Sequence, residues 1–182
     1  MEKIAIIGSP GAGKTTLAKD LQRILKIKVY HLARLFWRPK WQPLDRESRI
    51  DILQKLVQES QWIIEGTYIL SSEPRLNEAD TIIFLDIPFY RCFWRTIQRH
   101  WKVRGQFRRD IPEQSVDKLD LLRIYKLLMF PILDRKQLKQ KLLHYNSKQI
   151  VWLHSAKEVK VFLEDPELYI SVRSNPPNFL SN

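Results

Sequence analysis

A glycine-rich octet near the N-terminus places the strongest constraint on how this chain can fold. Residues 8–15 read Gly-Ser-Pro-Gly-Ala-Gly-Lys-Thr and match the pattern G-x-x-x-x-G-K-[ST] at every fixed position. The octet follows the apolar run from Lys3 to Ile7, and it precedes a segment from Thr15 to Lys26 whose apolar residues recur at helical spacing. A strand, a glycine loop and a helix in this order predict a phosphate-binding loop.

The residue types of the octet suit a polyphosphate ligand. Glycines let the backbone turn its N–H groups towards one point, and the first turn of the following helix adds further donors. ATP and Mg²⁺ are therefore the predicted cofactors, with Lys14 on the β- and γ-phosphates and Thr15 as a ligand of the metal. The alternative is a glycine-rich turn without a ligand. The residues predicted to bind nucleotide are Gly8, Ser9, Pro10, Gly11, Ala12, Gly13, Lys14, Thr15 and Thr16, together with Ser155 and Ala156 on the base side.

The rest of the chain alternates short apolar runs with helical patterns. Further strands are predicted at 29–32, 61–65, 81–86 and 149–153. Helices are predicted from Asp45 onward, over about 89–104, over 156–163, and in a long segment at 117–145 that Pro131 kinks or divides. Five short apolar strands separated by helices predict a three-layer α/β fold with a parallel sheet. Ligands of such sheets bind at the carboxyl ends of the strands.

Length, charge and cysteine content restrict the class of protein. The 182 residues predict a single domain over about 1–165 and a weakly ordered tail at 166–182. The net charge is +11, and residues 88–142 hold 14 Lys and Arg against 5 Asp and Glu, which indicates an anionic partner such as phosphate groups or nucleic acid. The single cysteine excludes intrachain disulfides. Without a long apolar run or a signal-like N-terminus, we expect a cytoplasmic protein with no membrane partner.

Four segments together resemble the DNA topology modulation protein family. They are the phosphate loop, Val29 to Trp41, Trp62 to Tyr68, and Ala79 to Asp86. The resemblance implies an adenylate-kinase-like P-loop kinase fold, in which five parallel strands numbered along the chain lie in the order 2-3-1-4-5. It also implies an ATP site and an arginine-bearing lid, expected at about 104–116, but it does not supply the phosphate acceptor.

Arginines occur on the helix that leads into the expected lid and within the lid itself. Arg91, Arg95 and Arg99 recur every four residues, so they lie along one face of the helix that leads into the basic loop. Charge on the transferred phosphoryl group is stabilised by such cations. The predicted catalytic residues are Lys14, Arg95, Arg99, Arg108 and Arg109. A solvated helix face and a DNA-contacting strip remain alternatives for the same arginines.

The segment HLARLFWRPKW follows the second strand and begins an acceptor-side insert at about 33–60. Aromatic and cationic side chains there suit a planar acceptor with an anionic group, although packing of the aromatic residues under the insert is the alternative. The predicted acceptor-binding residues are Arg34, Trp37, Arg38, Trp41, Tyr68 and Arg75.

Carboxylates at strand ends are candidates for metal positioning. Glu65 is the predicted partner of Thr15 at the Mg²⁺ site, Asp86 is the second candidate, and capping of a neighbouring helix is the alternative for both. His31 is expected to be half-buried and hydrogen-bonded. Ala33 stands where the family pattern has aspartate, so a general base that orients a hydroxyl acceptor is missing from this position.

These features predict transfer of the γ-phosphoryl group of ATP to a small acceptor such as a nucleotide or nucleoside. A nucleic-acid-associated ATP-binding protein, with the segment 88–142 on DNA, is the first alternative. A degenerate kinase that binds nucleotide without efficient turnover is the second, and Ala33 is the residue that favours it.

Overall fold

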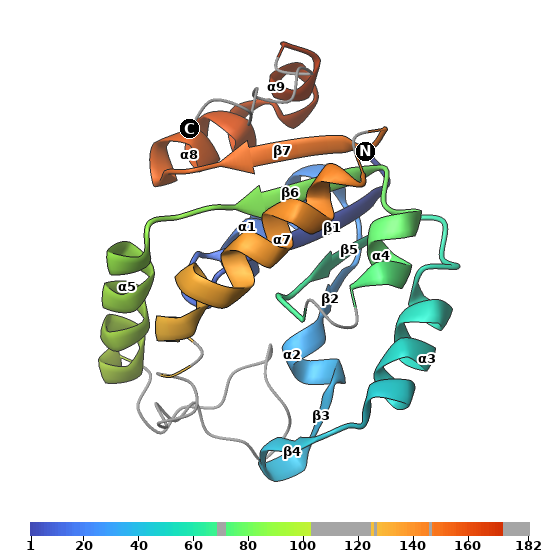
Figure 1. Ribbon diagram of the computed structural model, residues 1–182. Helices are drawn as coiled ribbons and strands as arrows, with labels where there is room; N and C mark the ends of the chain where they lie inside the picture. The colour runs from blue at the N-terminus through green and yellow to red at the C-terminus, as the bar shows by residue number, and fades with distance from the viewer. Residues whose placement is uncertain (69–71, 103–124, 126, 146, 173–182) are drawn as a thin grey trace.

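A five-stranded parallel sheet organises the computed structural model, which describes residues 1–68, 72–102, 125, 127–145 and 147–172 (Figure 1). The strands are β1 (Lys3–Gly8), β2 (Val29–His31), β5 (Trp62–Glu65), β6 (Thr81–Leu85) and β7 (Gln149–Leu153). Their order in the sheet is β2-β5-β1-β6-β7, and all neighbours run parallel. In chain order this is 2-3-1-4-5, so the predicted sheet is confirmed.

Both faces of the sheet are covered, as the continuous apolar strands predict. Along β1, Ile4 and Ile6 belong to one core cluster, whereas Ala5 and Ile7 belong to the other, and all four are fully buried. The alternation follows from the period of two in a strand. The fold therefore has three layers, with β1 and the loop that follows it at the centre.

Helices from different parts of the chain close the two faces. The first cluster includes residues of α1 (Lys14–Leu25), α5 (Phe89–Lys102), α8 (Ala156–Glu164) and α9 (Pro166–Val172). The second includes residues of α2 (Leu32–Leu35), α3 (Arg46–Leu56), α4 (Glu73–Glu78) and α7 (Arg135–Leu143). In Figure 1, α7 crosses in front of the sheet and α1 lies behind it.

Local sequence signals set several helix boundaries. Asp45 caps α3 by accepting a hydrogen bond from the Ser48 backbone N–H at 2.7 Å, as predicted. Ser155 caps α8 in the same way through the Glu158 N–H. Pro131 lies in a π-helical turn, η3 (Phe130–Asp134), that leads into α7, because its ring prevents a regular helix from continuing through it.

The acceptor-side insert contains structure that the sequence did not reveal. After α2, β3 (Trp37–Arg38) and β4 (Gln42–Pro43) pair antiparallel around the short 3₁₀ turn η1 (Pro39–Trp41). No strand was predicted between residues 33 and 44, because each strand of this hairpin has only two residues. The short helix α4, after β5, was also not predicted.

The prediction of a weakly ordered tail was wrong for its first seven residues, which form α9. The ring of Tyr169 packs edge-on against Phe162 of α8 at 5.4 Å, and Ile170 is buried beside it. Packing of these apolar side chains against α8 stabilises the helix, although the sequence of this segment suggests weak order. Residues 173–182 lie outside the described residues.

The helix α5 begins near the carboxyl end of β6, as predicted. The lid expected at about 104–116 lies outside the described residues. Among the helices that the structure describes, none combines the length and apolar character that crossing a membrane requires.

Candidate active site

The glycine octet forms the loop between β1 and α1, and its shape depends on glycine. Gly8, Gly11 and Gly13 have φ angles of 147°, 79° and 103°, in the region that side chains disfavour. A Cβ atom on Gly11 would lie 2.4 Å from the Cys92 carbonyl oxygen of α5. The loop is therefore pressed against α5 and has no space for a larger residue at this position.

Lys14 begins α1 and reaches back over the loop. Its Nζ donates hydrogen bonds to the carbonyl oxygens of Gly8 at 3.0 Å and Ser9 at 2.8 Å. Burial lowers the pKa of Lys14 to about 8, although the charge of Glu65 opposes this shift. The ammonium group lies over the loop, where a bound phosphate can replace these two carbonyls as its partner.

Glu65 connects the end of β5 with the first turn of α1. Its buried Oε1 accepts hydrogen bonds from the Thr15 hydroxyl at 3.2 Å and pairs with His31 Nδ1 at 2.9 Å. The expectation of a half-buried, hydrogen-bonded His31 is confirmed. The hydroxyl and carboxylate oxygens fit Mg²⁺, which binds few protein ligands beside phosphates and water. Within the described residues no cluster of three or more His, Cys, Asp or Glu could hold a metal ion by itself.

Two of the predicted catalytic arginines lie near the loop on α5. Arg95 Nη1 donates to the Ala12 carbonyl oxygen at 3.2 Å. The charge of Arg99 is close enough to help lower the pKa of Lys14, after burial as the main cause. Cations from α5 therefore reach the edge of the loop where phosphate charge is expected. Arg108 and Arg109 lie outside the described residues.

Aromatic side chains form one wall around Tyr68, in the loop that follows β5. Trp37 Nε1 donates to the Tyr68 hydroxyl at 2.8 Å, and the Trp37 and Trp41 rings meet edge-on at 5.7 Å. Phe36 is fully buried and packs edge-on against Tyr68 at 4.9 Å. The structure thus brings together three of the predicted acceptor residues, Trp37, Trp41 and Tyr68, over a packed Phe36.

The cationic acceptor candidates have different surroundings. Arg34 and Arg38 are exposed on α2 and β3. Arg75, on α4, is fully buried and donates from Nη2 to the carbonyl oxygens of Gly66 at 2.7 Å and Thr67 at 2.9 Å. The buried side chain of Arg75 thus lies against the backbone of the strand-end loop. Ala33 is half-buried on α2.

Sequence reasoning missed Thr67. Its hydroxyl donates to the Gly8 carbonyl oxygen at 2.6 Å and so ties the loop after β5 to the phosphate loop. Its position could have indicated a role, because Thr67 lies just past the carboxyl end of β5, which is next to β1 in the sheet.

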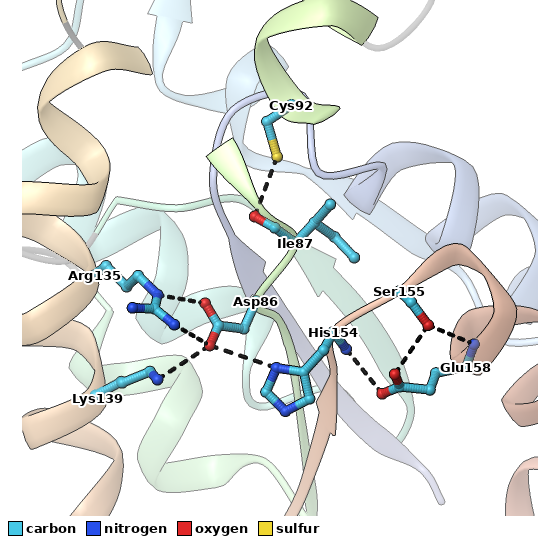
Figure 2. A network of polar contacts seen from close by, with 8 residues as sticks. All are labelled: Asp86, Ile87, Cys92, Arg135, Lys139, His154, Ser155 and Glu158. Atoms are coloured by element: carbon cyan, nitrogen blue, oxygen red, sulfur yellow. Dashed lines mark hydrogen bonds and ion pairs between the residues drawn. The ribbon is translucent and has the colours of Figure 1, made fainter. Parts of the chain in front are cut away.

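Asp86 belongs to an ion-pair cluster at the carboxyl ends of β6 and β7 (Figure 2). Arg135 donates to both carboxylate oxygens, at 2.6 and 2.9 Å, and Lys139 and His154 lie 3.1 and 3.6 Å away. Burial alone would raise the pKa of Asp86, but hydrogen bonds from His154, Arg135 and Lys139 hold it well below its usual range. The carboxylate fixes α7 to the sheet, which differs from the metal and capping roles considered from sequence.

The remaining predicted nucleotide residues lie at two helix starts. Thr16 is exposed in the first turn of α1. Ser155 accepts from the Glu158 N–H at 3.1 Å and donates to the Glu158 carboxylate at 2.9 Å, so its side chain is engaged in capping and only its backbone remains for a base. Ala156 begins α8 beside it.

Solved structures share this architecture. Shikimate kinase from Acinetobacter baumannii in complex with shikimate has a TM-score of 0.56 at 14% identity, covering 96% of both chains. Shikimate kinase from Bacteroides thetaiotaomicron gives 0.54 at 17%, covering 92% of this chain and 97% of that one. Deoxyadenosine kinase from M. mycoides with bound dATP gives 0.55 at 13%, covering 92% and 98%. The chain has a P-loop kinase fold.

Similarity at this level of identity shows the P-loop kinase fold and nothing finer. No protein-family model and no curated protein matches the chain. The resemblance to the DNA topology modulation family is therefore not shown by these comparisons.

Proposed function

We propose that the chain is a Mg²⁺-dependent phosphotransferase that binds ATP and transfers its γ-phosphoryl group to a small acceptor such as a nucleotide or nucleoside. One observation carries the proposal. Lys14 lies over the glycine loop with its ammonium group on the Gly8 and Ser9 carbonyls, and the Thr15–Glu65 pair lies beside it. A cation, the glycine-loop backbone and two oxygen-bearing side chains thus lie together at the start of α1, which is the combination that polyphosphate binding requires.

The chain's own residues have distinct parts in this proposal. The backbone N–H groups of the loop bind the phosphates, and Lys14 neutralises β- and γ-phosphate charge. Thr15 and Glu65 would hold Mg²⁺, which when bound supplies further charge neutralisation. Arg95, from α5, contacts the loop at Ala12 and adds positive charge where the transferred group becomes more negative.

The acceptor is proposed to lie against the aromatic wall of Trp37, Trp41 and Tyr68, with Arg34 and Arg38 at its rim. An acceptor oxygen attacks the γ-phosphorus while the bond to the β-phosphate oxygen breaks, which leaves ADP. A hydroxyl acceptor must also lose a proton, and Ala33 cannot receive it. An acceptor that is already a phosphate anion has no such proton, so it suits this site better.

The fold supports kinase activity in general. One neighbour is a shikimate kinase and another a deoxyadenosine kinase, so the same architecture serves kinases named for chemically different acceptors.

Replacement of Lys14 by alanine tests the proposal. Acceptor-stimulated ADP release, measured over a panel of nucleotides, nucleosides and small alcohols, should be lost in Lys14→Ala while the thermal unfolding midpoint changes little. The control is Lys55→Ala, an exposed change on α3. Unchanged ATP turnover in Lys14→Ala would overturn the assignment.

A nucleic-acid-associated ATP-binding protein is the second candidate, and one face of α5 favours it. Tyr90, Trp94 and Trp101 are 64%, 60% and 76% exposed, and Arg91 lies 5.8 Å from the centre of the Tyr90 ring. The helix contains four cationic residues, if histidine is left aside, and no carboxylate. Exposed aromatic rings among cations suit stacking on single-stranded nucleic acid.

Salt dependence separates the two candidates. Affinity for single-stranded DNA should fall steeply with salt and weaken in Trp94→Ala and in a variant neutralised at Arg108 and Arg109 if the second candidate is correct. Stimulation of ADP release by one acceptor, with no effect of DNA, favours the phosphotransferase.

A further inference from the structure

Arg75 is a buried cation whose contacts are with backbone rather than with a paired carboxylate at hydrogen-bond distance. Its side chain has no exposed surface, and burial lowers its pKa to about 10, with the charge of Glu65 opposing the shift. Its Nε and Nη1 have no hydrogen-bond partner among the residues that the structure describes. Burying a guanidinium with two unpaired nitrogens is costly. The two hydrogen bonds that its third nitrogen, Nη2, does make therefore need an explanation.

Both hydrogen bonds hold the strand-end loop, residues 66–68. Nη2 donates to Gly66 O at 2.7 Å and to Thr67 O at 2.9 Å, across a separation of nine and eight residues in sequence. The loop is strained at Tyr68, which has a φ of 21°. Gly66 has a φ of 151°, which glycine tolerates and other residues disfavour. A charged donor that bridges two successive carbonyls fixes a backbone conformation that the local sequence disfavours.

The strand-end loop reaches the phosphate loop through Thr67. The Thr67 hydroxyl donates to Gly8 O at 2.6 Å, and Lys14 Nζ donates to the same oxygen at 3.0 Å. Arg75 therefore acts on the phosphate loop across two hydrogen bonds, without touching it.

The residues on either side of Thr67 reach the other parts of the site. Glu65, just before the loop, contacts Thr15 at 3.2 Å, and Tyr68, at its end, accepts from Trp37 at 2.8 Å. A single buried side chain, that of Arg75, thus fixes the stretch of backbone that makes three contacts: Glu65 with Thr15, Thr67 with Gly8, and Tyr68 with Trp37.

We propose that Arg75 is a positioning residue that ties the strand-end loop to the phosphate loop through Thr67. Its effect on catalysis rests on the proposed function. The tie itself, which is the pair of hydrogen bonds from Arg75 to Thr67 and from Thr67 to Gly8, is a property of the protein without nucleotide. It can therefore be measured separately from turnover.

Amide hydrogen exchange of the nucleotide-free protein tests the tie. In Arg75→Met, which removes the donors and relieves the burial of a charge, peptides covering residues 8–17 should exchange about tenfold faster. Thr67→Val should have the same effect on residues 8–17, and Thr67→Ser, which keeps the hydroxyl, should restore wild-type exchange. The double variant should be no faster than the faster single variant, because both changes break one chain of contacts. Arg46→Met, an exposed change on α3, is the matched control.

The pattern of exchange distinguishes positioning from a general structural role. In Thr67→Val, the Gly66 amide, which donates to the Ile6 carbonyl oxygen at 3.1 Å, should keep its protection, since Arg75 still holds the loop; faster exchange there overturns the proposal even if Arg75→Met does not fold. Unchanged exchange of residues 8–17 in either single variant, or equal acceleration in β6, also overturns it. ADP binding by the wild-type protein is measured in parallel. If ADP does not bind, the proposed function fails, while the exchange pattern still decides the role of Arg75.

Discussion

The Thr15 hydroxyl lies 3.2 Å from Glu65 Oε1, joining the first turn of α1 to the end of β5. Fifty residues separate the two in sequence, and the parallel pairing of β1 with β5 brings them together. The hydroxyl that follows the loop lysine and the carboxylate of the neighbouring strand thus share one oxygen-rich corner beside the phosphate loop. The metal dependence of nucleotide binding should therefore depend on Glu65.

Replacing Glu65 by glutamine should weaken the effect of Mg²⁺ on nucleotide binding. The amide keeps the size of the side chain but loses the charge that attracts the cation, so we expect the Mg²⁺-dependent gain in ADP affinity to fall about tenfold. Affinity for ADP without Mg²⁺ should change little. Calorimetric titration with and without Mg²⁺ measures both, with the exposed change Glu78→Gln as control. Equal Mg²⁺ dependence in Glu65→Gln and wild type contradicts the metal assignment.

The two inner glycines of the phosphate loop should differ in their tolerance of alanine. At Gly11 a Cβ atom lies 2.4 Å from Cys92 O and 2.5 Å from Thr96 Oγ1, whereas at Gly13 the nearest atom is Arg95 Nη1 at 3.8 Å. Both have positive φ, so both variants carry backbone strain of about 1–3 kcal/mol, and Gly11→Ala adds overpacking of about 1–3 kcal/mol. Urea unfolding should show the larger loss in Gly11→Ala. The reverse order would mean that α5 does not press on the loop.

Sequence patterns predicted the parts of this protein whose cause is local or repeated. The octet at 8–15 carries its own conformational requirement in its glycines, and each core strand is an apolar run, so the loop and the strands were predictable from local pattern. The order of the strands was expected only from the family resemblance. The contact of Arg75 with Gly66 and Thr67 was not, because nothing in the segment Glu73–Glu78 shows that a cation turns inward there. Interior positions of charged residues are set by tertiary packing.

The role of Asp86 could not be predicted from the sequence either. A carboxylate at a strand end suits a metal ligand or a helix cap equally well, and its partners Arg135, Lys139 and His154 lie 49 to 68 residues further along the chain. Only the packing of α7 on β6 and β7 decides between these roles.

Replacing Asp86 by asparagine should destabilise the fold. The variant leaves Arg135 and Lys139 beside a buried amide, and removing one partner of a buried ion pair costs about 3–5 kcal/mol. We expect the lower part of this range, since both cations are partly exposed. Urea unfolding measures the loss, and the control is Glu73→Gln, in which a 66% exposed carboxylate loses its ion pair with Lys141, with an expected loss below about 1 kcal/mol. A loss of similar size in both variants contradicts the anchoring role of Asp86.

His154 should make the stability of this cluster depend on pH. The hydrogen bond with Asp86 raises the pKa of His154 above its usual 6.5, with burial opposing, in a setting that also includes Arg135, Lys139 and Glu158. A raised pKa in the folded state means that the contribution is complete below pH 6.5 and is lost as pH rises through the folded-state value. Because half of the side chain is exposed, we expect at most about 1 kcal/mol.

The pH effect is measured as the difference in unfolding free energy between wild type and His154→Asn from pH 5.5 to 8.5. This difference should be largest at the acidic end. His144→Asn is the control, because the His144 ring contacts the Gln140 carbonyl oxygen instead of a carboxylate. A difference for His154→Asn that does not vary with pH would show that its ring acts only by packing on Trp152.

Restoring a carboxylate at residue 33 tests the chemistry of the acceptor site. Ala33 is half-buried on α2, directly after Leu32, whose Cβ would lie 3.0 Å from a Cβ atom on Gly66. Position 33 therefore directly follows a residue that packs against the strand-end loop, which begins after Glu65 and ends at Tyr68. Ala33→Asp should accelerate phosphoryl transfer to hydroxyl acceptors about 100-fold, because the new carboxylate can accept the acceptor's proton. Transfer to phosphate acceptors should gain nothing and should weaken through repulsion between like charges.

Ala33→Asn separates proton acceptance from size, since the amide matches aspartate in shape but is not a base at neutral pH. Steady-state ADP formation with a nucleoside and with the corresponding nucleoside monophosphate gives the two rates to compare. If Ala33→Asp is no faster than Ala33→Asn with the nucleoside, position 33 does not face the attacking oxygen. If wild type already transfers as rapidly to the nucleoside as to the monophosphate, another group removes the proton, and the preference for an anionic acceptor that we derive from Ala33 is wrong.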